Sequence, residues 1–194
     1  MKTTIALSLF CLLLVACGDN GSEPIIIADM NETYTVEAID SGWVDSTQPD
    51  TPMVTEIDRL HCHWWMDKQQ ISYVKFSNPK KRRRCAVTRL ILNVMIEYES
   101  GADWPMLIAI YQVKDTSWIG SELTWNNQPG FSEDDLLAVV EYWGGGEINR
   151  VWVLNEASCH FRGDFFCVAV AVTEENLCEV AVALNPFLEV TIWY

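Results

Sequence analysis

The residues best suited to chemistry are three histidines, each of which sits beside a cysteine. They read His61-Cys62-His63 and Cys159-His160. Alternate residues of a strand share one face, so His61 and His63 would present two imidazoles together, and His160 could complete a zinc site. The alternative is that Cys62 points inward while the two histidines flank it on the outer face. No His-Glu-x-x-His set or comparable spacing occurs, so a zinc hydrolase is not predicted.

Other catalytic motifs are missing from the sequence. It contains no G-x-S-x-G elbow, no Walker loop and no Cys-His pair beyond simple adjacency. Clustered carboxylates, which a glycosidase would need as a pair, occur only at Glu133, Asp134, Asp135 and Glu147. The first three also fit the acidic first turn of a short helix capped by Ser132. We therefore predict that the protein is not an enzyme.

A basic run, Lys80-Lys-Arg-Arg-Arg84, stands in an otherwise acidic chain. Guanidinium groups match carboxylate and sulfate groups with paired hydrogen bonds. Arg82, Arg83 and Arg84 could therefore clamp an anionic polymer, such as a uronate or a sulfated glycan. The alternative is a solvated hairpin loop that pairs with the acidic body of the protein.

Nine tryptophans in a chain of 194 residues indicate a second kind of binding group. Indole faces can stack on sugar rings, and ligand pockets combine aromatic faces with a few polar groups. Trp64 and Trp65 are adjacent, so one of them should face outward from a strand. Trp118 and Trp125 are expected to be mainly structural. The candidate ligand contacts on this reasoning are Trp65, Trp104, Trp143, Asn126 and Asn127.

The N-terminal residues predict export and lipid attachment. Lys2 precedes an apolar run that is too short to span a bilayer. Leu14-Val15-Ala16-Cys17 then resembles a bacterial lipobox. That resemblance implies a signal peptide over residues 1–16, a lipid on Cys17 and a polar tether over residues 17–32. An ordinary cleaved signal peptide with an incidental cysteine is the alternative.

Such an anchor would place the protein in the bacterial cell envelope, at the outer membrane or cell surface, with its domain facing the periplasm or the exterior. Removal of Lys2 leaves 12 basic side chains against 27 acidic ones, a formal charge of −15. A surface of that charge repels nucleic acid, which is excluded as a partner. The membrane and other envelope proteins are the partners that this location implies.

Five cysteines would remain in an oxidising compartment, so at most two disulfides could form. Cys62 and Cys85 flank the same predicted pair of strands and are the first candidate pair. Cys159 and Cys167 lie symmetrically about a glycine, where a hairpin would place them opposite each other. Cys178 could pair with either of these two, and the sequence does not choose.

The elements that must position these residues are short strands. Most segments show a period of two or a continuous β-branched run between turn residues, which is typical of an antiparallel β-sandwich. The only predicted helix is short, at 132–139, and it could instead be a turn that leads into a strand. The predicted strands lie near 33–38, 59–66, 70–76, 87–98, 106–113, 121–125, 137–142, 150–154, 165–172, 179–184 and 187–193.

The segment from Trp118 to Pro129 reads W-I-G-S-E-L-T-W-N-N-Q-P. It resembles the W-x-E-x-x-L-T-W-N-N-x-P signature of the DNRLRE domain family, with which carbohydrate-binding module family 96 is grouped. Glu122 is shifted by two positions from the signature. Ser72-Tyr-Val-Lys-Phe76 and Pro186-Phe-Leu-Glu-Val190 are also similar to strands of this family.

This resemblance implies one all-β domain over residues 33–194, an antiparallel β-sandwich of the jelly-roll type. It implies a non-catalytic protein that binds a polysaccharide, for which the basic run favours an acidic one. A structural or adhesion module of an envelope complex, without glycan binding, is the alternative. Because sandwiches that bind carbohydrate often hold a structural Ca²⁺, Asp40, in an expected turn with Ser41 and Gly42, is a candidate calcium ligand.

Overall fold

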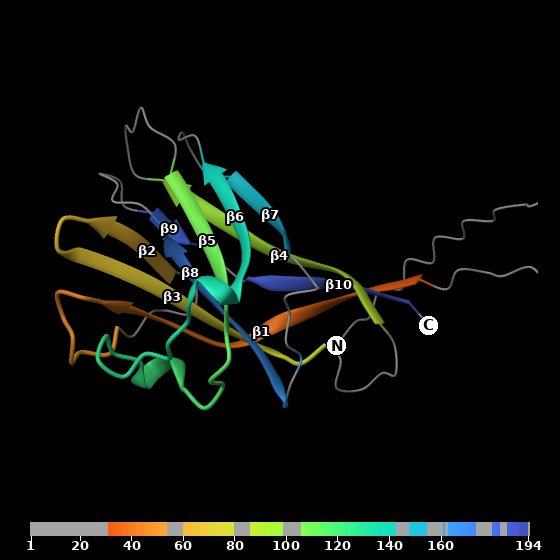
Figure 1. Cartoon of the computed structure of the whole chain (residues 1–194), viewed down its shortest axis with the longest axis horizontal. Coiled ribbons are helices and arrows are strands. Elements are labelled where there is room, and N and C mark those ends of the chain that lie inside the picture. Colours follow the sequence, from red (N-terminus) through yellow and green to blue (C-terminus); the bar gives the residue numbers. More distant parts are fainter. Residues whose placement is uncertain are drawn as a thin grey trace, which may run out of the picture.

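The computed structural model of this protein describes residues 31–53, 60–79, 86–98, 106–142, 148–154, 161, 163–173, 180–182 and 186–193. Ten strands account for most of these residues (Figure 1), and every pair of neighbouring strands is antiparallel. The predicted antiparallel all-β fold is therefore confirmed. No helix within the described residues has the length and apolar character needed to cross a membrane.

The strands follow one another along the chain with two short 3₁₀ turns between β5 and β6. The elements are β1 (Asn31–Asp45), β2 (Leu60–Trp65), β3 (Lys68–Ser77), β4 (Ala86–Tyr98), β5 (Met106–Val113), η1 (Gly120–Glu122), η2 (Glu133–Asp135), β6 (Leu136–Tyr142), β7 (Ile148–Leu154), β8 (Phe165–Val172), β9 (Val180–Val182) and β10 (Phe187–Trp193).

The sheet curls on itself because two strands belong to both of its halves. The first part of β1 pairs with β10, and the second part, after a bulge between Ala38 and Asp40, pairs with β3. Likewise β2 pairs first with β9 and then with β3. A bulge bends its strand and strengthens the local twist, which lets β1 turn this corner. We call β4, β7, β9 and β10 the β4 half, and β3, β5, β6 and β8 the β8 half.

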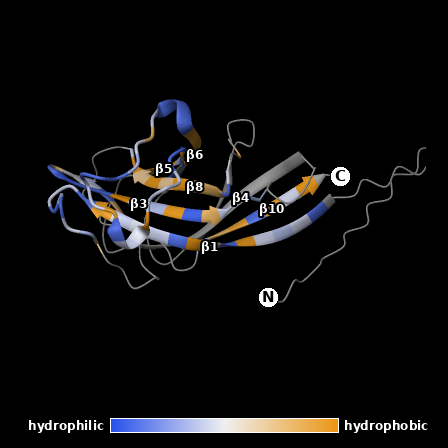
Figure 2. Ribbon diagram, turned by 90° about the horizontal axis from the view of Figure 1, so that it is seen from below, coloured by the Kyte–Doolittle hydropathy of each residue, from blue (hydrophilic) through white to orange (hydrophobic). Residues whose placement is uncertain are grey.

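The inner core lies between these halves. Val190 of β10 packs in one cluster with Phe76 of β3 and Phe166 of β8, and all three side chains are fully buried. Each such side chain contributes roughly 1.5–3 kcal/mol by leaving water. Figure 2 shows hydrophobic residues concentrated on the strands and hydrophilic residues on the connecting loops. This core is therefore the main source of the fold's stability.

A second apolar cluster covers the outer face of the β8 half. It joins Tyr73 of β3, Ala169 of β8 and Tyr111 of β5 to Trp118 and Leu123 from the segment after β5. Residues 114–131, which we call the cover segment, therefore bury the outer face of the β8 half, which a two-layer sandwich would leave exposed to solvent. The strands β5 and β8 lie inside the sheet, and both have residues buried on both faces.

Three sequence-based predictions of local structure need correction. The predicted strand at 121–125 is wrong: the chain forms η1 and then continues as a turn over residues 125–127. The expected turn at Asp40 is wrong too, because Asp40 lies within β1 and pairs with Lys75. The predicted helix shortens to η2, where Asp135 Oδ2 accepts hydrogen bonds from the amide and hydroxyl of Ser132, and the chain then enters β6.

The two cysteines that the structure describes, Cys62 and Cys167, are free thiols in the core. The predicted bridge between Cys62 and Cys85 is therefore wrong for Cys62, whose side chain points into the inner apolar cluster. The predicted pairing of Cys159 with Cys167 is likewise wrong for Cys167. Burial raises the pKa of both thiols, that of Cys167 to about 12. Cys85, Cys159 and Cys178 lie outside the described residues.

Candidate functional site

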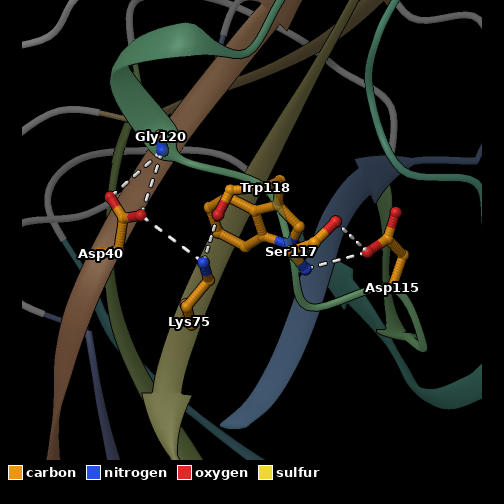
Figure 3. A network of polar contacts seen from close by, with 6 residues as sticks. All are labelled: Asp40, Lys75, Asp115, Ser117, Trp118 and Gly120. Carbon is orange, nitrogen blue, oxygen red and sulfur yellow. Dashed lines mark hydrogen bonds and ion pairs between the residues drawn. The ribbon is translucent and has the colours of Figure 1, made fainter.

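The signature segment is fastened to the outer face by a buried lysine. The side chain of Lys75, in the middle of β3, donates a hydrogen bond to the carbonyl oxygen of Trp118 and lies 4.3 Å from the centre of the Trp118 ring (Figure 3). Its ammonium group is 3.7 Å from Asp40 Oδ2. A buried ammonium needs such partners, because its hydration is lost. Lys75 therefore anchors the cover segment to the sheet through Trp118.

Asp40 completes the attachment from the neighbouring strand. Both oxygens of its carboxylate accept the amide of Gly120, at 3.2 and 3.1 Å. Gly120 also lies so close to β1 that a Cβ atom there would be 2.0 Å from the carbonyl oxygen of Ser41. Only glycine allows this approach of two backbones.

The far end of the signature is held in the same way. The Tyr73 hydroxyl donates to Gln128 Oε1 at 2.7 Å. Asn127 Oδ1 accepts the Thr124 amide at 2.7 Å, and its Nδ2 donates to the carbonyl oxygen of Glu122 at 2.9 Å. The amide side chain thereby closes a local turn. Asn127, predicted to contact ligand, is thus used within the fold.

Asn126 is also placed by internal contacts. Its Nδ2 donates to Asp50 Oδ1 at 2.7 Å, and its backbone amide donates to the carbonyl oxygen of Pro49. Both asparagines are exposed, but Asn126 holds the turn of residues 125–127 against the loop after β1, whereas Asn127 bonds to residues just before it in the signature. The polar groups of the signature therefore shape the fold.

A pocket opens on the same outer face, next to the cover segment. Its volume is about 310 Å³, which falls in the lower part of the range for small-ligand pockets. Five strands of the sheet (β2, β3, β5, β6 and β8) and the region of η2 contribute to its lining. The lining residues are Trp64, Gln69, Leu107, Tyr111, Phe131, Glu133, Leu136, Val139, Ala171, Val172 and Thr173.

Aromatic rings form two sides of this pocket. Phe131 stacks on Tyr111, with ring centres 4.6 Å apart and an angle of 25° between the rings. Trp64 belongs to the β2–β3 hairpin, where it pairs with Gln69. Cross-strand partners share a face, so the indole and the amide of this pair are presented together.

The polar lining groups are few and distinct. Thr173 is held at the end of β8, where its amide donates to the carbonyl oxygen of Leu107 at 3.0 Å. Gln69 is half-buried, and Glu133 is exposed at the start of η2. Burial raises the pKa of Tyr111, and the negative charge of Glu133 raises it further, so this phenol stays neutral over the physiological range.

The hairpin that carries Trp64 is fixed from outside. Ser46 Oγ donates to the carbonyl oxygen of Asp67 at 3.0 Å and accepts the amide of Gln69 at 2.7 Å. At the tip, Met66 has a positive φ of 52° and is exposed. The hairpin that carries Trp64 and Gln69 is therefore held in place by Ser46, the residue that follows β1.

The family model of carbohydrate-binding module family 96 matches residues 32–142, which is more than half of the chain. The chain belongs to this family. None of the curated proteins matches the chain. The family 96 match runs from β1 to β6 and includes the signature, the cover segment and most of the pocket lining. The wall formed by Ala171–Thr173 comes from β8, which lies between β3 and β5 in the sheet although it follows the matched residues.

Several predicted contacts of this family 96 domain cannot be placed at the pocket. Trp104, Trp143, Arg82, Arg83 and Arg84 lie outside the described residues. Trp65 is the last residue of β2 and directly follows Trp64. Trp118 is buried in the outer cluster, which confirms its predicted structural role.

The predicted metal sites are not assembled by the described residues. No three or more His, Cys, Asp and Glu side chains gather there in a way that could hold a metal ion. His63 is buried, and the ring of His61 lies 4.6 Å from that of Trp43. His160 lies outside the described residues, so the zinc set stays a prediction. Calcium at Asp40 also stays a prediction, and its carboxylate already holds Gly120 and faces Lys75.

Sequence reasoning missed most of the pocket. The sequence predicts only that one of the adjacent residues Trp64 and Trp65 faces outward. Tyr111 lies before the cover segment and Phe131 is the last residue of that segment, and Thr173 lies much further along the chain. Their proximity depends on β8 lying between β3 and β5, and no local pattern signals that order.

Proposed function

We propose that this family 96 domain is a non-catalytic polysaccharide-binding module of the bacterial envelope, anchored by a lipid on Cys17. The observation that carries the proposal is the pocket on the β8 half. It places the Trp64 indole and the Phe131 ring beside the neutral polar groups Gln69 and Thr173. Rigid aromatic surfaces with a few polar groups are what a sugar ring requires of a binding site.

The arrangement of carboxylates favours binding over hydrolysis. Glycosidases place two carboxyl groups on either side of the scissile bond. Of the clustered acids, Asp135 is buried, caps η2 and forms an ion pair with Lys114 Nζ at 2.5 Å. Asp134 is exposed and does not line the pocket, and Glu147 lies outside the described residues. Glu133 is therefore the acid that the described lining offers.

A glycan array probed with the detergent-solubilised full chain tests the proposal. We expect binding to one class of polysaccharide, and we expect Trp64→Ala to weaken it by roughly thirtyfold, as truncation of a central aromatic contact does. Ile119→Ala, an exposed apolar residue outside the lining, is the matched control and should leave binding unchanged.

Silence across neutral and acidic polysaccharides would refute glycan binding. The structural or adhesion module of an envelope complex would then be the better hypothesis, and a partner protein should co-purify in detergent. An acidic polysaccharide held by Arg82, Arg83 and Arg84 belongs to the same proposal as a second contact region. Replacing these three arginines with glutamine tests that region separately.

A further inference from the structure

We propose that the pocket on the β8 half is part of a groove that runs across the strands and holds a polysaccharide along several consecutive sugar residues. This inference rests on the proposed function and names the stretch of polymer that the same site takes. Side chains from β2, β3, β5, β6 and β8 line the pocket. Neighbouring strands lie about 4.8 Å apart, so a lining shared by these strands extends over roughly 20 Å. That length exceeds a single sugar ring.

Strand pairing places the residues of this groove in a row. Val139 of β6 pairs with Ala109 of β5, and Ala109 pairs in turn with Ala171 of β8. Trp64 of β2 and Gln69 of β3 form the pair at the other end of the lining. Cross-strand partners share a face of the sheet. The row therefore begins at Trp64 and Gln69, passes over the two alanines and ends at Val139.

The two alanines keep the middle of the row low. Ala109 is fully buried and Ala171 is 5% exposed. Leu107 and Thr173 lie on the same face, two residues nearer the end of the sheet, and both are half-buried. The amide of Thr173 donates to the carbonyl oxygen of Leu107 at 3.0 Å, which holds these larger residues side by side. They form a rim beside the alanine floor.

Aromatic rings close the groove on the side of the cover segment. The Phe131 ring stacks on Tyr111 of β5 and lies 6.4 Å from the ring of Tyr73 of β3, measured between ring centres. These two tyrosines belong to the strands on either side of β8, so the aromatic wall runs across the strands. A polymer lying along the strands would meet this wall, whereas a polymer lying across them would run parallel to it.

The β6 end of the groove is open to a longer ligand. Val139 lines the pocket, yet its side chain is 48% exposed. In the described part of the sheet, β6 is the last strand in the order. Val139 can therefore pack against a further sugar ring, beyond those held between Trp64 and Phe131.

The test uses oligosaccharides cut from the polysaccharide that binds best on the array, from the disaccharide to the octasaccharide. Calorimetric titration of the detergent-solubilised full chain should show an affinity that rises by about tenfold or more with length and then levels off, once the ligand spans the groove. Trp64→Ala should weaken binding at every length. Val139→Ala should weaken only the longer ligands, by about threefold, because two methyl groups lose contact with them.

Ile119→Ala is the matched control for Val139→Ala, since Ile119 is 50% exposed and lies outside the lining. It should leave the affinity unchanged at every length. Thermal unfolding of each variant is measured in parallel. Val139→Thr keeps the β-branched side chain that suits a strand, and it repeats the test if Val139→Ala is destabilised.

An affinity that does not depend on ligand length would overturn the inference, because the pocket would then hold a single terminal ring. An equal loss of affinity at every length in a Val139 variant of normal stability would also overturn it. Both results leave the proposed function standing. Absence of binding to every glycan would instead refute the proposed function itself, so the two failures are distinguishable.

Discussion

Gly42 of β1 and Gly120 of η1 meet backbone to backbone. A Cβ atom on Gly42 would lie 2.6 Å from the carbonyl oxygen of Gly120. This contact seats the signature segment on the sheet, and the bond from the Gly120 amide to Asp40 fixes its position along β1. The family signature thus attaches the cover segment to β1, which pairs with β3 of the β8 half.

Gly120→Ala should therefore destabilise the domain by at least ~2 kcal/mol, because two backbones must separate to admit the methyl group. Gly130→Ala is the matched control, since nothing lies within 4 Å of a Cβ atom at that position. It should change stability by less than ~0.5 kcal/mol. Urea unfolding of both variants measures the difference, and equal stabilities would contradict the contact.

Lys75→Met should lower the stability of the domain by about 2 kcal/mol. Removal of the buried ammonium group leaves Asp40 and the carbonyl oxygen of Trp118 without their partner. The same substitution at Lys114, whose side chain is 59% exposed in its pair with Asp135, should cost at most ~1 kcal/mol. Thermal unfolding of the two variants compares these positions. A larger loss at Lys114 would show that the Lys75 network contributes little.

Asn127→Ala should lower the stability of the domain by about 1–2 kcal/mol and leave glycan affinity unchanged. Its side chain makes two hydrogen bonds that close the turn, to Thr124 and Glu122. Calorimetry of unfolding and of ligand binding on the same preparation separates the two roles. Loss of affinity in a variant of normal stability would return Asn127 to the binding site.

The ionisation of the Asp45 carboxyl group makes the stability of the domain depend on pH. Burial acts to raise its pKa, but hydrogen bonds from Thr47 and Gln70 outweigh this and hold the pKa below its ordinary value of 3.8. A lowered pKa in the folded state contributes stability above the ordinary pKa, and this is lost as the pH falls through the folded value. Asp45→Asn should therefore cost about 1–3 kcal/mol at neutral pH.

The cost of Asp45→Asn should begin to shrink below about pH 4, where the carboxyl group of the unfolded chain becomes protonated, and should be lost once the pH is below the lowered pKa of folded Asp45. Asp134→Asn is the control and should change stability by less than ~0.5 kcal/mol at either pH. Urea titrations at both pH values provide the measurement. A cost that is independent of pH would mean that the Asp45 charge does not stabilise the fold.

Cys62 and Cys167 should resist alkylation in the native protein and react once it is unfolded without reductant. Their burial excludes the reagent, and their raised pKa values leave little thiolate. Peptide mass spectrometry of labelled protein reports each position. A peptide in which Cys62 is crosslinked to Cys85 would restore the disulfide predicted from the sequence.

The strands could be predicted because alternation and β-branched runs are local signals. Phe165–Val172 is a continuous apolar run that predicted a strand, and this strand is buried on both faces. What covered it could not be predicted. Leu123 and Trp125 have good strand propensity, yet this part of the chain lies across a sheet face, so the predicted strand did not form.

The site was harder to predict than the fold. The asparagines of the signature looked like ligand contacts because they are polar and next to tryptophan, but Asn127 satisfies the backbone of its own turn. Trp64 and Phe131 come together only through the order of strands in the sheet. Chemistry that depends on strand order is visible once the pairing is known.

The length of β1 has a mechanical consequence. Asn31 at its start pairs with Trp193, and Asp45 at its end pairs with Gln70, which is next to Gln69 of the pocket lining. With a tether attached before Asn31 and a polymer held at the pocket, tension would run along this strand. Antiparallel hydrogen bonds lie perpendicular to their strands. The ladders of β1 to β10 and to β3 would therefore be loaded in shear, where many bonds resist together, and would not be peeled apart one at a time.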